Sequence, residues 1–113
     1  MVASTRLEGE MVCLTVIYPT SSGSHFDGKY YLEKHMPFAG RLCEPFGLKK
    51  VEVSEGRQGL DGSKAAYHFM ANLYFESAEG LQKGFARHGA ELVADIPNYT
   101  NVQPMIYVGE VQS

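Results

Sequence analysis

A tyrosine and a histidine, Tyr31 and His35, stand four residues apart in a stretch with helical spacing. Residues at i and i+4 share one face of a helix, and Asp27 falls on the same face one turn earlier. The imidazole titrates near neutral pH and could take or give a proton, while the phenol could polarise a carbonyl. The pair therefore suits enolisation, aldol-type cyclisation or dehydration of a small ketone. A structural alternative has His35 bonding backbone carbonyls that Pro37 leaves free.

The other histidines offer weaker candidates for chemistry. His88 lies in the apolar stripe of a predicted helix, which would direct it at the sheet. There it would be a second proton-transfer group or a packed core histidine. His68 lies on a predicted strand, where it could line a pocket between subunits or bond across an interface. His25 lies in a Ser/Gly loop, as a pocket lid or as an exposed loop residue.

Phenols are frequent in this chain, which has seven tyrosines and no tryptophan. Aromatic rings with polar tips can line a pocket for an aromatic substrate, and they serve interfaces equally well. The predicted substrate-binding set is Tyr30, His68, Asn72 and Tyr74.

Asp95 and Asn98 flank an Ile-Pro pair in the run 94–101. One interpretation makes Asp95 a carboxylate at a pocket mouth. The alternative has both side chains stabilise a turn through hydrogen bonds to the backbone, and turn chemistry explains every residue of the run.

Motifs for cofactors are missing from the sequence. There is no phosphate loop, no Gly-x-Gly-x-x-Gly and no serine nucleophile motif, so we expect no nucleotide cofactor. Without a Cys-x-x-Cys or His-x-x-x-His pair, we expect no metal site. Cys13 and Cys43 are predicted to be reduced, half-buried thiols of a cytoplasmic protein. Heme stays an alternative, because one histidine can be enough to hold it.

The elements that must position these residues alternate as strand, helix, strand, twice over. The predicted strands span residues 11–18, 48–55, 67–75 and 102–111. The first helix is predicted from a capping box of Ser24 and Asp27 to about Cys43, with a kink or a restart at Pro37. The second begins after Ser77, and its stripe comprises Leu81, Phe85, His88 and Leu92.

This βαββαβ order is typical of the ferredoxin-like α+β fold, a four-stranded antiparallel sheet with two helices on one face. The side carrying Phe69 and Leu73 should meet Phe85 and Leu92 of the second helix. The opposite face is also largely apolar, and such faces are seldom left bare. We therefore predict a homodimer in which two sheets enclose an α/β barrel. The face comprises Cys13, Thr15, Ile17, His68, Met70, Asn72 and Tyr74.

The length and composition of the chain fit one domain. The chain has 113 residues, a net charge of -3 and a pI of about 5.8, which argues against binding nucleic acid or an anionic membrane. Its apolar runs fall far short of the ~20 residues that a membrane span needs. Residues 1–10 lack the pattern of a signal peptide and are expected to form a flexible arm before a single domain, residues 11–113.

Several short segments, in order along the chain, resemble the EthD family of dimeric α/β-barrel proteins. The resemblance covers nearly everything from Met11 to Val111, and its strongest mark is the run Ala94-Asp95-Ile96-Pro97-Asn98-Tyr99-Thr100-Asn101. A lone His-x-Pro would be weak, but the set in order is specific. The other marks are His25-Phe26-Asp27 before Tyr30-Tyr31, His35-Met36-Pro37, Gly47-Leu48-Lys49 and Phe85-Ala86-Arg87-His88-Gly89.

The resemblance implies the fold more firmly than the reaction. It implies a link to bacterial ether degradation, where the founding member accompanies a cytochrome monooxygenase system. Similar folds include cofactor-free monooxygenases, lactone isomerases, polyketide cyclases or dehydratases, and heme-handling proteins. We expect a cofactor-free isomerase, lyase/cyclase or monooxygenase that acts on a small hydrophobic or aromatic carbonyl compound, with His35, Tyr31 and His88 as catalytic candidates. The alternatives are a non-catalytic binding or auxiliary protein of an oxidase pathway, and a heme binder.

Overall fold

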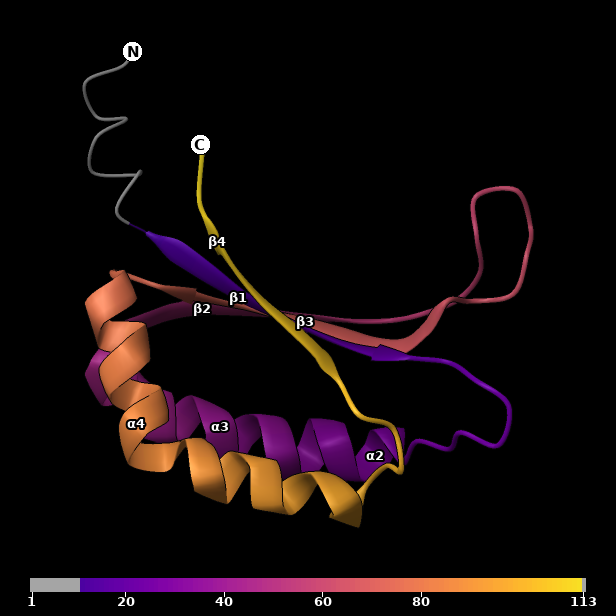
Figure 1. Ribbon diagram of the computed structural model, residues 1–113, viewed down its shortest axis with the longest axis horizontal. Coiled ribbons are helices and arrows are strands. Elements are labelled where there is room, and N and C mark those ends of the chain that lie inside the picture. The colour runs from indigo at the N-terminus through magenta and orange to yellow at the C-terminus, as the bar shows by residue number, and fades with distance from the viewer. Residues whose placement is uncertain (1–10, 113) are drawn as a thin grey trace.

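Four antiparallel strands form one sheet in the computed structural model, which describes residues 11–112 (Figure 1). The strands are β1 (Val12–Pro19), β2 (Leu48–Glu55), β3 (Tyr67–Phe75) and β4 (Met105–Glu110). They lie in the order β2-β3-β1-β4, and each neighbouring pair is antiparallel. Both helical segments lie on the same face of this sheet. The predicted ferredoxin-like α+β fold is confirmed, and the arm predicted for residues 1–10 lies outside the described residues.

The fourth strand begins later than the sequence predicted. Its ladder with β1 starts at Met105, paired with Ile17, and not at Val102. Pro104 has no N–H to donate, which is why pairing starts only after it. Residues 99–101 are also held elsewhere, against the segment that precedes the first helix.

One continuous helical segment follows β1, in three parts. These are α2 (Gly28–Tyr30), the π-helical turn η1 (Tyr31–His35) and α3 (Met36–Cys43). The cap is Asp27, whose Oδ1 accepts from the N–H of Tyr30 at 3.1 Å. Ser24, predicted to share the cap, instead closes a turn with Ser21.

Pro37 lies in the first turn of α3, so the predicted restart at this proline is confirmed, although the helical segment continues without a break. The residues before it widen into η1, where the N–H of Met36 donates to the carbonyl of Tyr31, five residues back. A proline ring clashes with the carbonyl four residues earlier in an α-helix, and a wider turn moves that carbonyl away.

The second long helix, α4 (Ala78–Asp95), is capped by Ser77, whose Oγ accepts from the N–H of Gly80 at 3.1 Å. A short 3-10 turn, η3 (Ile96–Asn98), follows it directly. The prediction that the run 94–101 ends a helix is confirmed. A similar turn, η2 (Glu44–Phe46), ends the first helical segment and leads through Gly47, at φ 93°, into β2.

The core lies between the sheet and the helices and consists of two clusters. A mainly aliphatic cluster lies toward the start of β1, with Phe85 of α4 packed against it, as predicted. An aromatic cluster fills the other end, beneath α2. Within residues 11–112, no helix has the length and apolarity that crossing a bilayer requires. The buried members are Val12, Leu14, Cys43, Ala71, Leu73, Phe75 and Leu81 in the first cluster, and Tyr18, Tyr31, Phe69 and Tyr99 in the second.

Candidate active site

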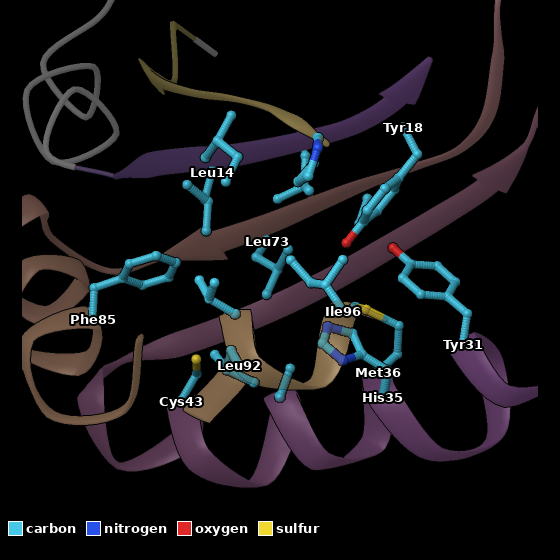
Figure 2. Close-up of a pocket in the computed structure, with 16 residues that line it drawn as sticks. Leu14, Tyr18, Tyr31, His35, Met36, Cys43, Leu73, Phe85, Leu92 and Ile96 are labelled. Atoms are coloured by element: carbon cyan, nitrogen blue, oxygen red, sulfur yellow. The ribbon is translucent and has the colours of Figure 1, made fainter. Parts of the chain in front are cut away.

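A small cavity lies between the helix-facing side of the sheet and the helices, and its volume is about 60 Å³. Figure 2 shows side chains from both layers converging on it. Its walls are mostly aliphatic, and three lining residues carry oxygen or nitrogen in the side chain: Tyr18, Tyr31 and His35. A buried water needs roughly 10–15 Å³, so the cavity suits a small polar head group and not a bulky ligand.

Tyr31 and His35 stand side by side in the cavity wall, on the turn η1. Their rings are nearly parallel, with 14° between the planes and 5.7 Å between the centroids. Both residues are buried. The structure therefore brings these two predicted residues together. Asp27, expected on the same face, caps the helix and is exposed.

His35 is held by a carboxylate from the other helix. Its Nδ1 lies 2.8 Å from Oδ2 of Asp95, the last residue of α4. Their side chains are 8% and 17% exposed. A carboxylate only accepts, so Nδ1 carries the proton and Nε2 keeps the lone pair of the neutral ring. The partner is not the backbone near Pro37, which the structural alternative required.

The other ring nitrogen of His35 is available to a ligand. Among residues 11–112, Nε2 has no hydrogen-bond partner, and no fully buried side-chain polar atom is left unpaired. His35 lines the cavity, and Nε2 is the ring nitrogen that the bond to Asp95 leaves free. An imidazole oriented on one side by a carboxylate and open on the other is the arrangement of a general base.

Asp95 accepts hydrogen bonds from three side chains. Besides His35, its Oδ1 accepts from Tyr30 Oη at 2.7 Å and from Asn98 Nδ2 at 2.9 Å. Burial alone would raise the pKa of this carboxyl, but hydrogen bonds from Asn98, His35 and Tyr30 outweigh it and hold the pKa below its usual value. Asp95 is thus charged at neutral pH. The expected bonds from this side chain to the turn backbone are absent, because the side chains of the site take their place.

Contacts between two distant segments bring Asp95 to the first helix. The N–H of Asp27 donates to the carbonyl of Tyr99 at 2.7 Å, and Thr100 Oγ1 donates to the carbonyl of His25 at 2.7 Å. These bonds fix the end of α4 beneath α2. The run 94–101 therefore both ends a helix and docks the carboxylate against the imidazole.

A second phenol, Tyr18 of β1, enters the cavity from the sheet. Figure 2 shows the hydroxyls of Tyr18 and Tyr31 pointing toward each other. Tyr18 Oη lies 2.6 Å from Tyr99 Oη, and when Tyr99 donates, the proton of Tyr18 is free to point into the cavity. Burial raises the pKa of Tyr18, Tyr31 and Tyr99 above the usual value, so all three stay protonated and act as donors.

His88 does not face the sheet, and that expectation was wrong. Its Nδ1 lies 2.7 Å from Glu91 Oε1, and its ring meets the ring of Phe46 edge-on at 5.9 Å. Phe46 packs on the side of α4 formed by Gly80, Gly84 and His88. The residues of the predicted stripe on α4 therefore face η2 in part and the sheet only in part.

The predicted substrate-binding residues do not line the cavity. Tyr30 supports Asp95 from behind. His68 lies at the register shift between β1 and β3, where its Nε2 contacts Ser24 Oγ at 2.9 Å and its ring stacks on Phe26 beside the aromatic cluster. The other two lie on the open face of the sheet: Asn72 Oδ1 accepts from Thr15 at 2.7 Å, and Tyr74 donates to Glu52 at 3.0 Å. They could bind a ligand only from that face.

Two residues of the site, Tyr18 and Asp95, were missed or undervalued by sequence reasoning. Tyr18 sits at a strand end, where a buried tyrosine looks like any core aromatic. Asp95 did carry a signal, because a carboxylate in the last turn of a helix opposes the helix dipole and costs roughly 0.3–1 kcal/mol. Such a cost needs a compensating partner, which His35 provides.

Within the described chain, no three His, Cys, Asp or Glu side chains gather as a metal ion would need.

Neither a protein-family model nor a curated protein matches the sequence. Solved structures do match it. An EthD-like protein from Ralstonia eutropha JMP134 is 31% identical, with 89% of this chain and 91% of that one covered and a TM-score of 0.82.

Two more distant structures share the fold. The hydroxynitrile lyase from Passiflora edulis is 12% identical over 91% of this chain and 94% of its own, with a TM-score of 0.65. A variant of SnoaB, a cofactor-independent oxygenase from Streptomyces nogalater, is 7% identical over 93% and 95%, with a TM-score of 0.62. At these identities the likeness is one of fold alone.

Proposed function

Because this chain belongs to the EthD-like family, we propose that it is a small cofactor-independent enzyme that acts on an apolar carbonyl compound by acid–base catalysis. The observation that carries the proposal is the buried His35, which lines a mostly apolar cavity, is bonded to Asp95 at 2.8 Å and keeps Nε2 unpaired among the described residues. A base of this kind in a water-poor space is typical of proton abstraction next to a carbonyl.

The common first step is enolisation. Nε2 of His35 takes a proton from the carbon beside the carbonyl, the electron pair of that C–H bond forms the new C=C bond, and the π pair of the C=O bond moves to the oxygen. Tyr31 and Tyr18 donate hydrogen bonds to the oxygen as its charge grows. Asp95, as a positioning residue, holds the imidazolium in place. Returning the proton to another carbon completes an isomerisation, and giving it to a leaving hydroxyl completes a dehydration.

The fold relatives agree with chemistry of this class. A lyase and a cofactor-independent oxygenase occur on the same fold, and this supports a reaction carried by side chains alone. It does not choose between isomerase, lyase/cyclase and monooxygenase, because function belongs to the site and not to the fold.

Deuterium exchange tests the proposal before a substrate is known. Small ketones and β-keto esters are incubated with the protein in D₂O, and incorporation at the α-carbon is followed by NMR. We expect exchange by the wild type and background exchange by His35→Asn, whose amide nitrogen can still donate to Asp95 but offers no base. His88→Asn is the matched control, because His88 lies outside the cavity, and it should exchange like wild type. Equal exchange by wild type and His35→Asn would overturn the proposal.

A second candidate function, a non-catalytic binder, is favoured by the aliphatic walls of the cavity. Such a protein would hold a hydrophobic metabolite or assist an oxidase of a degradation pathway. Saturable binding of ketones without exchange, hydrolysis or any other product would support this candidate. Product in excess of protein would exclude it.

Heme fits this cavity poorly. Nε2 of His35 is the only free imidazole nitrogen of the described residues that lines it, and a volume of about 60 Å³ is far below the size of a porphyrin. A Soret band that appears on heme addition and is lost in His35→Asn would show that the protein binds heme through His35.

The open face of the sheet supports the homodimer. Its central residues on β1 and β3, including Ile17 and Met70, are only half-buried, and Met105 and Tyr107 of β4 are exposed beside them. A second copy laid on the same face would cover these side chains. Light scattering should give twice the monomer mass, and Met70→Arg should return the protein to a monomer.

A further inference from the structure

A groove on the surface, between the end of α4 and the start of β4, adjoins the cavity beside His35. The groove has a volume of about 440 Å³. Four residues line both the groove and the inner cavity: Val93, Ile96, Pro104 and Ile106. Figure 1 shows the segment that joins α4 to β4 turning back from the helix end to the sheet, and this segment forms the groove floor.

The shared wall is unusually apolar for a surface. Val93 is 55% exposed and Ile106 is 45% exposed, although both are aliphatic. The exposed polar side chains of Asn101 and Gln103 line the groove but not the inner cavity, and they form its polar rim. An apolar path that leads outward from a polar centre to a polar rim suits a ligand with a polar group at its inner end and an apolar chain beyond it.

Size decides how a ligand would be divided between the two spaces. The inner cavity, at about 60 Å³, has room for a carbonyl group and its immediate neighbours beside His35 and Tyr31. The larger remainder of a ligand must therefore leave the cavity, and the shared wall of Val93 and Ile106 is the place where the cavity meets the larger groove.

We propose that the substrate is an elongated carbonyl compound, whose carbonyl lies at His35 and whose unbranched apolar tail runs out between α4 and β4 over Val93 and Ile106. This inference rests on the proposed function for the role of His35. It adds the substrate class and makes Val93 and Ile106 residues that determine specificity for chain length.

A homologous series of ligands tests the proposal. The affinities of 2-alkanones from 2-butanone to 2-nonanone are measured by titration calorimetry with the full chain. Each methylene that enters the groove should tighten binding about fourfold, the factor that corresponds to ~0.8 kcal/mol for a buried CH₂. The gain should level off once the tail passes the polar rim.

Two variants block the path, and one leaves it open. Ile106→Trp fills the shared wall, and Val93→Asp puts a charge on the other side of it. Because both residues also line the inner cavity, 2-butanone is the reference ligand: both variants should weaken the long ketones at least tenfold more than they weaken 2-butanone. Val108→Trp is the matched control, because Val108 lies on the same strand and face, is 58% exposed and lines neither space. It should bind the whole series like wild type.

The outcomes separate this inference from the proposed function. The proposal that the ligand tail lies in the groove is refuted if affinity does not rise with chain length, or if it falls equally in Ile106→Trp and Val108→Trp. This holds even if the protein catalyses exchange on 2-butanone. A rise with chain length that both blocking variants abolish supports the groove, including the case in which His35→Asn exchanges like wild type and the catalytic proposal fails.

Discussion

Replacing Asp95 by Asn would reverse the hydrogen-bond polarity at His35 with almost no change in volume. Asp95 accepts from His35, Tyr30 and Asn98, while an asparagine offers one accepting oxygen and two donating hydrogens. With its oxygen toward Tyr30 and Asn98, its amide faces Nδ1 of His35. Nδ1 must then accept, so the proton moves to Nε2, and the base facing the cavity is lost.

The magnitude follows from the bonds at stake. A hydrogen bond to a charged group contributes ~1.5–3 kcal/mol, and a neutral one ~1 kcal/mol. The variant loses the charge-assisted bond to His35 and weakens the two others, but Asp95 is partly exposed, so solvent offsets some of the loss. We expect unfolding to become easier by about 2–4 kcal/mol. A wrong tautomer behind an intact site should slow α-proton exchange by roughly 10³–10⁴-fold.

Three measurements check this prediction: urea unfolding, deuterium exchange at pH 7, and ¹⁵N chemical shifts of the imidazole nitrogens. The shifts should put the proton on Nδ1 in the wild type and on Nε2 in Asp95→Asn, which a merely structural role would not require. Asp27→Asn is the control, because it makes the same chemical change at an exposed N-cap, where Asn caps as well as Asp. If Asp95→Asn exchanges within tenfold of wild type and keeps the proton on Nδ1, Asp95 does not orient His35.

Three further predictions concern the same fold. Tyr31→Phe should slow exchange tenfold or more and change stability by less than about 1 kcal/mol, because the Tyr31 hydroxyl has no hydrogen-bond partner among residues 11–112; a stability loss equal to the catalytic loss would contradict its role as a donor. The pKa of the Asp95 carboxyl is lower in the folded protein than its value of about 3.9 in the unfolded chain, so the charged carboxylate stabilises the fold at pH values above 3.9. This contribution to the free energy of unfolding is lost as the pH falls through the folded pKa. In urea unfolding between pH 5 and pH 2, Asp95→Asn should therefore lose less stability than wild type. Gly40→Ala should stabilise by up to ~1 kcal/mol, since nothing lies within 4 Å of its new Cβ, whereas Gly80→Ala should destabilise, because its Cβ would clash with the carbonyl oxygen of Phe46; thermal melts of the two variants decide this.

The fold was predictable because its signals are local. Alternation marks β3, and the Ser77 cap with its apolar stripe marks α4. The start of β4 was missed, because the contact of Thr100 with the loop before α2 is not encoded nearby in the sequence. The π-helical turn before Pro37 was missed for a similar reason, since a proline in a helical pattern predicts a disturbance but not its form.

The site was only half predictable. Tyr31 and His35 are one helical turn apart, so spacing alone could pair them. His35 and Asp95 are 60 residues apart, and periodicity within either helix says nothing of their contact. His88 shows the opposite error, because a stripe residue on α4 can face either the sheet or η2, and the two cannot be told apart without the packing of Phe46.

Two local penalties in this chain converge on one imidazole. Pro37 interrupts a helix, and Asp95 places a negative charge at a helix C-terminus, where the dipole disfavours it. Sequences that otherwise agree with their fold break local rules mainly at functional sites. A purely structural His35 would need neither penalty, and both of its ring nitrogens would be expected to find partners in the protein. Instead, one nitrogen is bonded to a charged carboxylate and the other has no partner among the described residues, which is the asymmetry that proton transfer requires.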